Sequence, residues 1–459
     1  MAQTPAHRAS TDAPVTPLPP AGPGPMQVTR RRLFGLAGGA LVVGAAAWSG
    51  PLLGPDEVAY AAAAPPDLYL AGTDGWIHLP PSPAIPPYHP DPLAPPGLTT
   101  YVFGFRNVTG LTDTQRLAQK NKAQHSAPLF WANQYDGNPA NEFRVQLTNL
   151  GLQLRPDLFD AHTLHWHGFR NVIPFFDGEP TGSVSVPAGR EFTYVYRPRD
   201  PGTYMYHCHV EDVEHVHMGM TGMVFVRPSQ DGDTSHYPSG RYLYNDGDGS
   251  TGYDREFAMF LSEVWAEAHW ADAHIQLPEW SDYRADFALL NGRVYPDTVA
   301  PNGSVDPFHP VRDSSGDLIA PAGHPELQYQ PMSSLVTCNA GERVALRFAN
   351  LGFRESAMTL TGIRMRVVGR DATPMRGSDG TDTSYETGTL DIGPGESYDV
   401  VFTAPPATGA GPFDTYYLYN RSFARSNNLA SGGFGGQATE IRVYASGVAP
   451  QAYPNDWGI

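Results

Sequence analysis

Short runs of apolar, aromatic and β-branched residues recur along the chain between glycine- and proline-rich turns, and they predict strands. Examples are Tyr101–Phe105, Glu142–Asn149 and Thr203–Val210, the last preceded by the turn-like Asp200-Pro-Gly. The 459 residues include 48 glycines and 45 prolines, and only 17% of residues are charged. This pattern predicts an all-β protein of about two domains rather than a helical bundle.

The second half of the chain repeats the first. Glu342–Gly352 echoes Glu142–Gly151, and further pieces of the first half reappear in the same order. Residues 229–254, rich in Asp, Gly and Ser, separate the halves and predict an acidic linker. We therefore expect one domain over residues 65–228 and a second over residues 255–459.

Metal-binding side chains are concentrated between His162 and Met220, a stretch with seven of the sixteen histidines and one of the two cysteines. Alternate residues of a strand share a face. One face therefore presents four imidazoles, those of His165, His167, His207 and His209. The opposite face presents His162 and Cys208, and the following loop can bring His215 and Met220 to it. Imidazole, thiolate and thioether together form a soft donor set that suits copper.

The simpler interpretation is a pair of strands whose histidines are only buried and hydrogen-bonded. Each buried imidazole without a partner would cost roughly 1–3 kcal/mol. Four imidazoles facing one another have no evident neutral partners, so this interpretation is disfavoured.

The segments His162-x-x-His165-x-His167-Gly and His207-Cys208-His209-x5-His215-x4-Met220 resemble the copper motifs of the multicopper oxidases, the laccase-like cupredoxin enzymes. The resemblance implies two consecutive cupredoxin-like Greek-key β-sandwiches. It implies that a type 1 copper is held by His162, Cys208, His215 and Met220. It also implies that His165 binds a type 2 copper and that a type 3 pair is bound by His167, His207 and His209.

One spacing departs from that family. The second type 1 histidine follows the cysteine by five residues in many relatives, whereas His215 follows Cys208 by seven. We interpret the difference as a two-residue insertion in the loop, and His217 and Met218 remain alternative ligands.

The second half of the chain has lost the corresponding donors. Ser356-Ala-Met-Thr359-Leu-Thr361 stands where the His162–His167 motif stood. Tyr416-Tyr-Leu-Tyr-Asn420-Arg421-Ser422 stands in place of Tyr204-Met-Tyr-His207-Cys208-His209. The oxygen-reducing cluster of the family uses eight histidines from two domains, and this chain supplies four of them. A second subunit would then have to complete the cluster, so we expect a homo-oligomer.

Three functions agree with these residues. The first is a copper-dependent oxidase that takes single electrons from phenols, aromatic amines or metal ions and passes them to dioxygen. The second is a blue-copper electron-transfer protein without a complete cluster. The third is an enzyme with one type 1 and one type 2 copper, as in copper nitrite reductases. A net charge of −17 makes nucleic acid an unfavourable partner.

The N-terminal residues 1–64 look like a targeting segment. Thr29-Arg-Arg-Arg-Leu-Phe-Gly35 resembles a twin-arginine signal, and a short apolar run and small-residue cleavage sites follow it. This predicts export to the periplasm, cell wall or exterior. The proline-rich residues 65–100 predict an extended arm around the first domain, and we expect no disulfide between Cys208 and Cys338.

Overall fold

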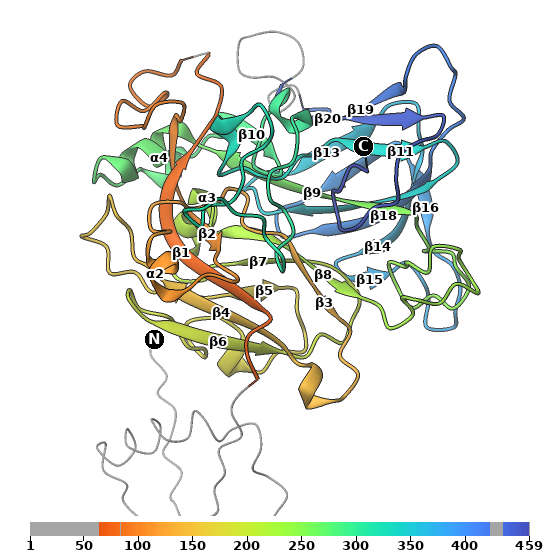
Figure 1. The fold of residues 1–459 in the computed structure, drawn as a ribbon, viewed down its shortest axis with the longest axis horizontal. Coiled ribbons are helices and arrows are strands. Elements are labelled where there is room, and N and C mark those ends of the chain that lie inside the picture. The colour runs from red at the N-terminus through yellow and green to blue at the C-terminus, as the bar shows by residue number, and fades with distance from the viewer. Residues whose placement is uncertain (1–63, 83, 423–434, 459) are drawn as a thin grey trace, which may run out of the picture. The chain divides into compact units, whose positions relative to one another are not determined.

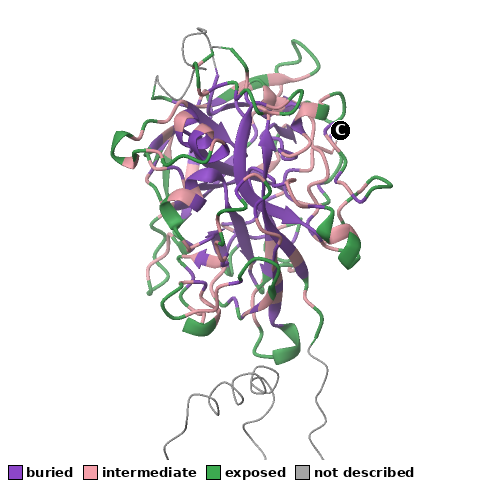
Figure 2. Ribbon diagram, turned by 90° about the vertical axis from the view of Figure 1, so that its left-hand side faces the viewer, coloured by how far each residue is buried: buried purple, intermediate pink, exposed green. Residues whose placement is uncertain are grey.

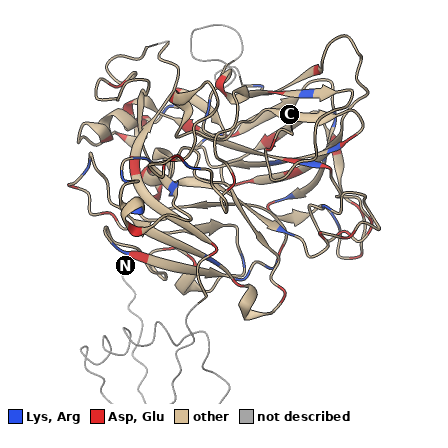
Figure 3. Cartoon of the chain, in the orientation of Figure 1, with Lys and Arg blue, Asp and Glu red and all other residues tan. Residues whose placement is uncertain are grey.

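The computed structural model describes residues 64–82, 84–422 and 435–458, which form two β-sandwiches (Figure 1). The expected leader falls almost wholly in residues 1–63, outside the described part of the chain. No helix among the described residues is long and apolar enough to cross a membrane. Acidic and basic side chains are interspersed along the described chain (Figure 3).

The first domain pairs two four-stranded sheets, with strand orders β2-β1-β4-β6 and β3-β8-β7-β5. Its strands are β1 (Leu68–Ile77), β2 (Thr100–Asn107), β3 (Phe130–Asn133), β4 (Phe143–Asn149), β5 (His165–His167), β6 (Glu191–Tyr196), β7 (Gly202–His207) and β8 (Thr221–Arg227). Its helices are α2 (Asp113–Leu117), α3 (Asp212–Met218) and the 3-10 turns η1 (Pro139–Asn141) and η2 (Pro174–Phe176).

The second domain repeats this plan in two larger sheets, β10-β9-β12-β18-β14-β15 with β16 on β14, and β11-β20-β19-β13-β17. Its strands are β9 (Arg255–Val264), β10 (Phe287–Leu290), β11 (Val336–Asn339), β12 (Arg343–Asn350), β13 (Ser356–Leu360), β14 (Met365–Arg370), β15 (Thr373–Pro374), β16 (Tyr385–Thr387), β17 (Thr389–Ile392), β18 (Ser397–Thr403), β19 (Asp414–Asn420) and β20 (Ala438–Tyr444). Its helices are α4 (Ala266–Ala273), η3 (Trp280–Asp282), η4 (Asp297–Val299) and η5 (Pro325–Leu327).

The duplication expected from sequence is visible in the strand pairing. β1 runs parallel to β4 as β9 does to β12, and β3 runs parallel to β8 as β11 does to β20. Each domain encloses its own apolar core, and buried residues concentrate in the strands (Figure 2). The all-β fold with two cupredoxin-like sandwiches is therefore confirmed.

Two segments differ from their prediction. Residues 68–77 are not part of an arm. They form β1, which lies between β2 and β4 inside a sheet and is buried at almost every position. The linker at 229–254 is also well packed, because Tyr242, Tyr244 and Tyr253 are buried and Asp246 accepts hydrogen bonds from Thr251.

Buried polar contacts join the two domains at β7, the strand that leads to the histidine-cysteine motif. The Thr203 hydroxyl donates to Asp399 at 2.5 Å, and the Thr203 carbonyl accepts from the Ser397 hydroxyl at 2.8 Å. Arg347 lies beside the same carboxylate of Asp399, at 3.4 Å. All four side chains are buried, so the second domain holds this strand in place.

Candidate metal centres

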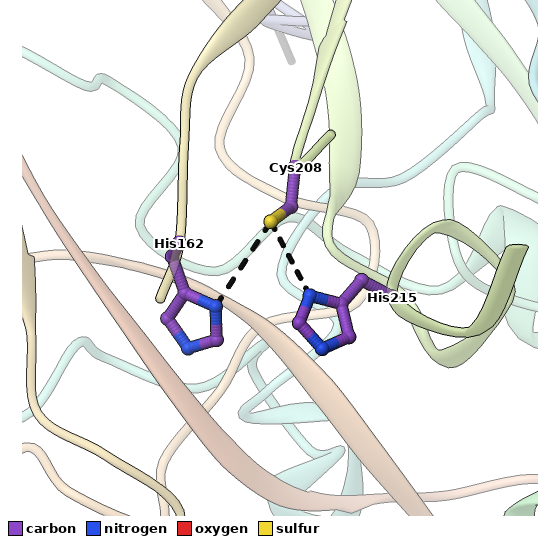
Figure 4. Close-up of side chains that lie close together, drawn as sticks. All are labelled: His162, Cys208 and His215. Carbon is purple, nitrogen blue, oxygen red and sulfur yellow. Dashed lines mark hydrogen bonds between the residues drawn. The ribbon is translucent and has the colours of Figure 1, made fainter. Parts of the chain in front are cut away.

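Three of the predicted ligands converge in the core of the first domain (Figure 4). The sulfur of Cys208 lies 3.3 Å from Nδ1 of His215 and 3.9 Å from Nδ1 of His162. All three side chains are fully buried. Nε2 of His162 has no hydrogen-bond partner, and the two Nδ1 atoms face the sulfur. This is a compact, water-excluded thiol–imidazole site.

The backbone brings each ligand to this point from a different element. His162 is fixed by a two-hydrogen-bond bridge to Val186, and Cys208 directly follows β7. His215 lies on α3, a helix where sequence predicted only a lengthened loop. Met220 follows that helix, and its backbone bonds both to His215 and to Cys208.

A glycine on β1 makes room for two of the ligands. A Cβ atom at Gly72 would lie 2.6 Å from the His162 ring and 3.3 Å from the methyl group of Met220. Met220 is fully buried beside His162, so its thioether would be the fourth ligand of a metal held at this site. Gly72 is a member of the site that the sequence pattern does not reveal.

The pKa of the thiol distinguishes Cys208, in this site, from Cys338. Burial alone would raise the pKa of Cys208, but the charge of His215 and a hydrogen bond with His162 hold that pKa well below its usual value. Burial opposes protonation of His215 as well, yet the Cys208 thiolate and Asp160 raise the pKa of His215 to about 10. Cys338 sits in the second core, where burial raises its pKa to about 12. Both cysteines are free, and only Cys208 has the environment of a metal-binding thiolate.

Asp160 supports the second imidazole of the site. Its carboxylate lies 3.4 Å from Nε2 of His215, so Nε2–H donates and Nδ1 stays directed at the sulfur. Such a carboxylate partner fixes the tautomer of a ligating histidine. Asp160 is a second residue that sequence reasoning missed.

The alternative ligand His217 lies outside the thiol site. Its Nε2 accepts a hydrogen bond from the backbone N–H of Trp265 at 3.1 Å. Its ring packs among Trp280, Tyr283 and Phe353. The other alternative, Met218, is buried in the core of the first domain.

The four remaining histidines gather on the opposite face of β5 and β7, as their alternation predicts. His165 is paired with His207 across the two strands, and nitrogens of His165, His167 and His207 lie within 4.8 Å of one another. The ring of His209 is 5.0 Å from that of His165 and 5.4 Å from that of His207. We call this group the four-histidine face.

Burial favours the neutral form of three of these imidazoles, those of His165, His167 and His207. It lowers the pKa of His165 and His167, and it lowers the pKa of His207 to about 3. A neutral imidazole has a free lone pair, so the rings stay available to a metal ion at mildly acidic pH.

The second domain carries a copy of the thiol site in which other side chains stand at the ligand positions. Asn420 donates from its backbone to the Gln437 carbonyl, as Cys208 does to Met220, so these pairs correspond. The Asn420 amide donates to the Gln437 side chain at 2.7 Å, and the Ser356 hydroxyl donates to it at 3.2 Å. In the second domain, side-chain hydrogen bonds therefore connect the residues that stand where the first domain has its predicted metal ligands.

This register corrects one detail of the sequence comparison. Thr359 pairs with Tyr419, as His165 pairs with His207. Tyr419 is therefore the counterpart of His207, and Asn420 that of Cys208. The sequence comparison had matched Asn420, Arg421 and Ser422 to His207, Cys208 and His209, one residue too late.

Two family models, both described as multicopper oxidase, match residues 143–231 and 278–446, which together make up more than half of the chain. The chain belongs to the multicopper oxidase family. A 52-residue stretch is 42% identical to laccase-like multicopper oxidase 1 of Thermothelomyces thermophilus, covering 10% of this chain and 8% of that protein.

Solved multicopper oxidases share the fold. A blue copper oxidase from Nitrosomonas europaea is similar over 82% of this chain and 85% of its own, with 19% identity and a TM-score of 0.52. The multicopper oxidase mgLAC covers 84% of this chain and 87% of its own, with 21% identity and a TM-score of 0.52.

Membership of the multicopper oxidase family implies copper as the cofactor. The thiol site fits a type 1 copper, because its thiol and imidazole groups are the right kinds of ligand, are buried, and lie close together. The four-histidine face fits copper too, but it supplies only half of the eight imidazoles of the family's trinuclear cluster.

Proposed function

We propose that this multicopper oxidase homologue is an oxidoreductase that accepts single electrons at His162, Cys208, His215 and Met220. Phenols, aromatic amines and metal ions are the proposed reductants, and dioxygen the proposed acceptor. Bound copper would supply the one-electron redox chemistry. The buried Cys208 thiol between two imidazole nitrogens is the observation that carries the proposal.

The chain offers a short route between the two groups of ligands. Cys208 lies between His207 and His209 in sequence, so each residue of the four-histidine face on this segment is one peptide unit from the thiol. The His207 ring also bonds to the Cys208 carbonyl at 2.8 Å. These contacts couple the electron-accepting site to the opposite face.

Copper loading of Cys208→Ser and Cys338→Ser tests the proposal. Cys208→Ser should lose the intense blue thiolate-to-Cu(II) absorption and the oxidation of a phenolic reductant, while Cys338→Ser keeps both. Oxygen uptake during phenol oxidation by the native protein identifies dioxygen as the acceptor. A Cys208→Ser protein that stays blue would remove the basis of the proposal.

An enzyme with one type 1 and one further copper is the second candidate function. It is favoured by the second domain, in which Thr359, Thr361, Tyr419 and Arg421 stand where imidazoles would be needed. Steady-state reduction of a small inorganic oxyanion such as nitrite, without oxygen uptake, would support this second function.

We further propose export by the twin-arginine route and assembly into a homo-oligomer. The arginine motif before an apolar run supports the first, and the incomplete histidine set supports the second. Arg31→Lys combined with Arg32→Lys should retain the folded protein in the cytoplasm, and the mass of the native protein in solution reports its assembly.

A further inference from the structure

Two imidazoles and two carboxylates gather outside the predicted copper motifs, where segments of both domains meet. They belong to His78, which directly follows β1, and to Asp297, His324 and Glu326 of the second domain. We call them the interdomain histidine–carboxylate group. Nε2 of His78 lies 3.8 Å from Oδ2 of Asp297, and Nδ1 of His324 lies 3.0 Å from Oε1 of Glu326. The four side chains are between 20% and 37% exposed, so an ion can reach them from solvent.

Two buried side chains hold these segments together. Oε1 of Gln330 accepts from the His78 backbone N–H at 2.8 Å, and Nε2 of Gln330 donates to the His78 carbonyl at 2.9 Å. Arg293 donates to the Gln330 carbonyl at 2.7 Å and to the Asp297 carbonyl at 3.1 Å. Gln330 lies three residues after η5, the turn that contains Glu326. Because Gln330 and Arg293 are buried, these contacts fix the backbone segments of the group relative to one another.

Hydrogen bonds leave one ring nitrogen of each histidine for a metal ion. Nδ1 of His78 lies 2.9 Å from the Gly97 carbonyl, which can only accept, so Nδ1 carries the proton and Nε2 has a free lone pair. Nδ1 of His324 donates to the Glu326 carboxylate at 3.0 Å, which leaves its Nε2 in the same state. A carbonyl or carboxylate on one ring nitrogen is the usual support of a histidine that binds metal through the other.

The gap between His78 and Asp297 has the size expected for two ligands of one ion. At 3.8 Å the two atoms are too far apart for a hydrogen bond. Zinc bonds to imidazole nitrogen and to carboxylate oxygen are about 2.0–2.2 Å long, so an ion between the two atoms contacts both. Burial raises the pKa of Asp297, the charge of His78 opposes that rise, and the charges of Glu326 and His324 also act on this carboxyl. The second pair therefore lies near the first, and rotation of its partly exposed side chains can bring them to the same ion.

We propose that the interdomain histidine–carboxylate group binds one zinc ion, which links the two domains. Two carboxylates neutralise the charge of a divalent ion, and two neutral imidazoles complete a set of four nitrogen and oxygen ligands that zinc accepts. Calcium and magnesium take oxygen ligands, so the two imidazoles disfavour them. The inference does not depend on the proposed function, because no residue of the thiol site or of the four-histidine face takes part.

Calorimetric titration with zinc tests the proposal on the copper-loaded protein, after a chelator has removed weakly bound copper. We expect one zinc ion per chain, an unchanged visible spectrum, and an unfolding temperature that rises with zinc concentration. His78→Gln and Asp297→Asn should each weaken zinc binding at least about 10-fold, because each removes a ligand at nearly constant side-chain size. His309→Gln is the control, since His309 also pairs with a carboxylate, that of Asp306 at 3.2 Å, but is 87% exposed; it should leave zinc binding unchanged.

Other results would overturn the inference. Unchanged zinc affinity in both His78→Gln and Asp297→Asn would show that the ion binds elsewhere, and a change of the visible spectrum on zinc addition would place it at the copper ligands. Equal stabilisation by magnesium would contradict an imidazole-bound ion. His324→Gln guards against loss of folding as the cause, because this partly exposed side chain should lower zinc affinity and leave the zinc-free unfolding temperature unchanged.

Discussion

Replacing Gly72 by alanine should disturb the thiol site selectively. The new methyl carbon would lie 2.6 Å from Cδ2 of His162 and 3.3 Å from the Met220 methyl group. Carbon atoms in contact are about 3.5–4.0 Å apart, so the His162 ring must move by about 1 Å. Gly72 has no positive φ angle, so alanine adds crowding and no backbone strain.

The expected loss of folding stability follows from adding a methyl group to an already well-packed core. Inserted methyl groups in well-packed interiors typically cost about 1–3 kcal/mol, and β1 is held on both sides by β2 and β4. Urea unfolding of the copper-free protein should show this loss. The copper-loaded variant should have a weakened or shifted blue band, because His162 is displaced from the thiolate.

A glycine in open space serves as the control for this experiment. Gly388 also lacks a positive φ angle, and a Cβ there would meet only Arg364, at 3.7 Å. Gly388→Ala should keep native stability and colour. If Gly72→Ala keeps the native blue spectrum and the native copper affinity, the placement of His162 and Met220 around this glycine is wrong.

Two further predictions concern histidines. His215→Ala should bleach the copper-loaded protein and His217→Ala should not, since only His215 faces the thiol; the visible spectrum decides. Burial, aided by the nearby charge of His269, lowers the pKa of His125 to about 3, so the folded protein excludes a proton that the unfolded chain binds below pH 6.5. The free energy of unfolding should therefore decrease as the pH is lowered below 6.5, by up to about 1.4 kcal/mol per pH unit. Between pH 6 and pH 4.5, the free energy of unfolding measured with urea should fall by about 2 kcal/mol less in His125→Leu than in the native protein.

Strand alternation was sufficient to sort the copper-motif residues into two groups. His165 and His207 lie on one face of β5 and β7, and Cys208 points into the opposite core, because side-chain direction on a strand is a local property. The repeat likewise predicted a second domain without ligands; in the structure, the Asn420 amide in that domain donates to the Gln437 side chain.

Contacts between distant segments were not predictable from sequence. Gly72 on β1, Asp160 in a loop of the first domain and Gly395 in the second domain each lie against a histidine that is distant in sequence, and no local sequence pattern predicts such contacts. β1 was mistaken for an arm because it is buried on both faces and so lacks alternation. The one-residue shift at Tyr419 became visible only through strand pairing, since the aromatic repeat is compatible with either register.

The fixation of β7 at Thr203 has a kinetic consequence. Electron transfer at a metal slows when the ligands must rearrange between oxidation states. Thr203 is bound by Ser397 and Asp399 from the second core, and Cys208, at the far end of the same segment, is bound by Met220. A ligand clamped between close-packed interiors has little freedom to shift. Under the proposed function, this fixation by the second domain would lower the reorganisation energy of a copper bound at Cys208.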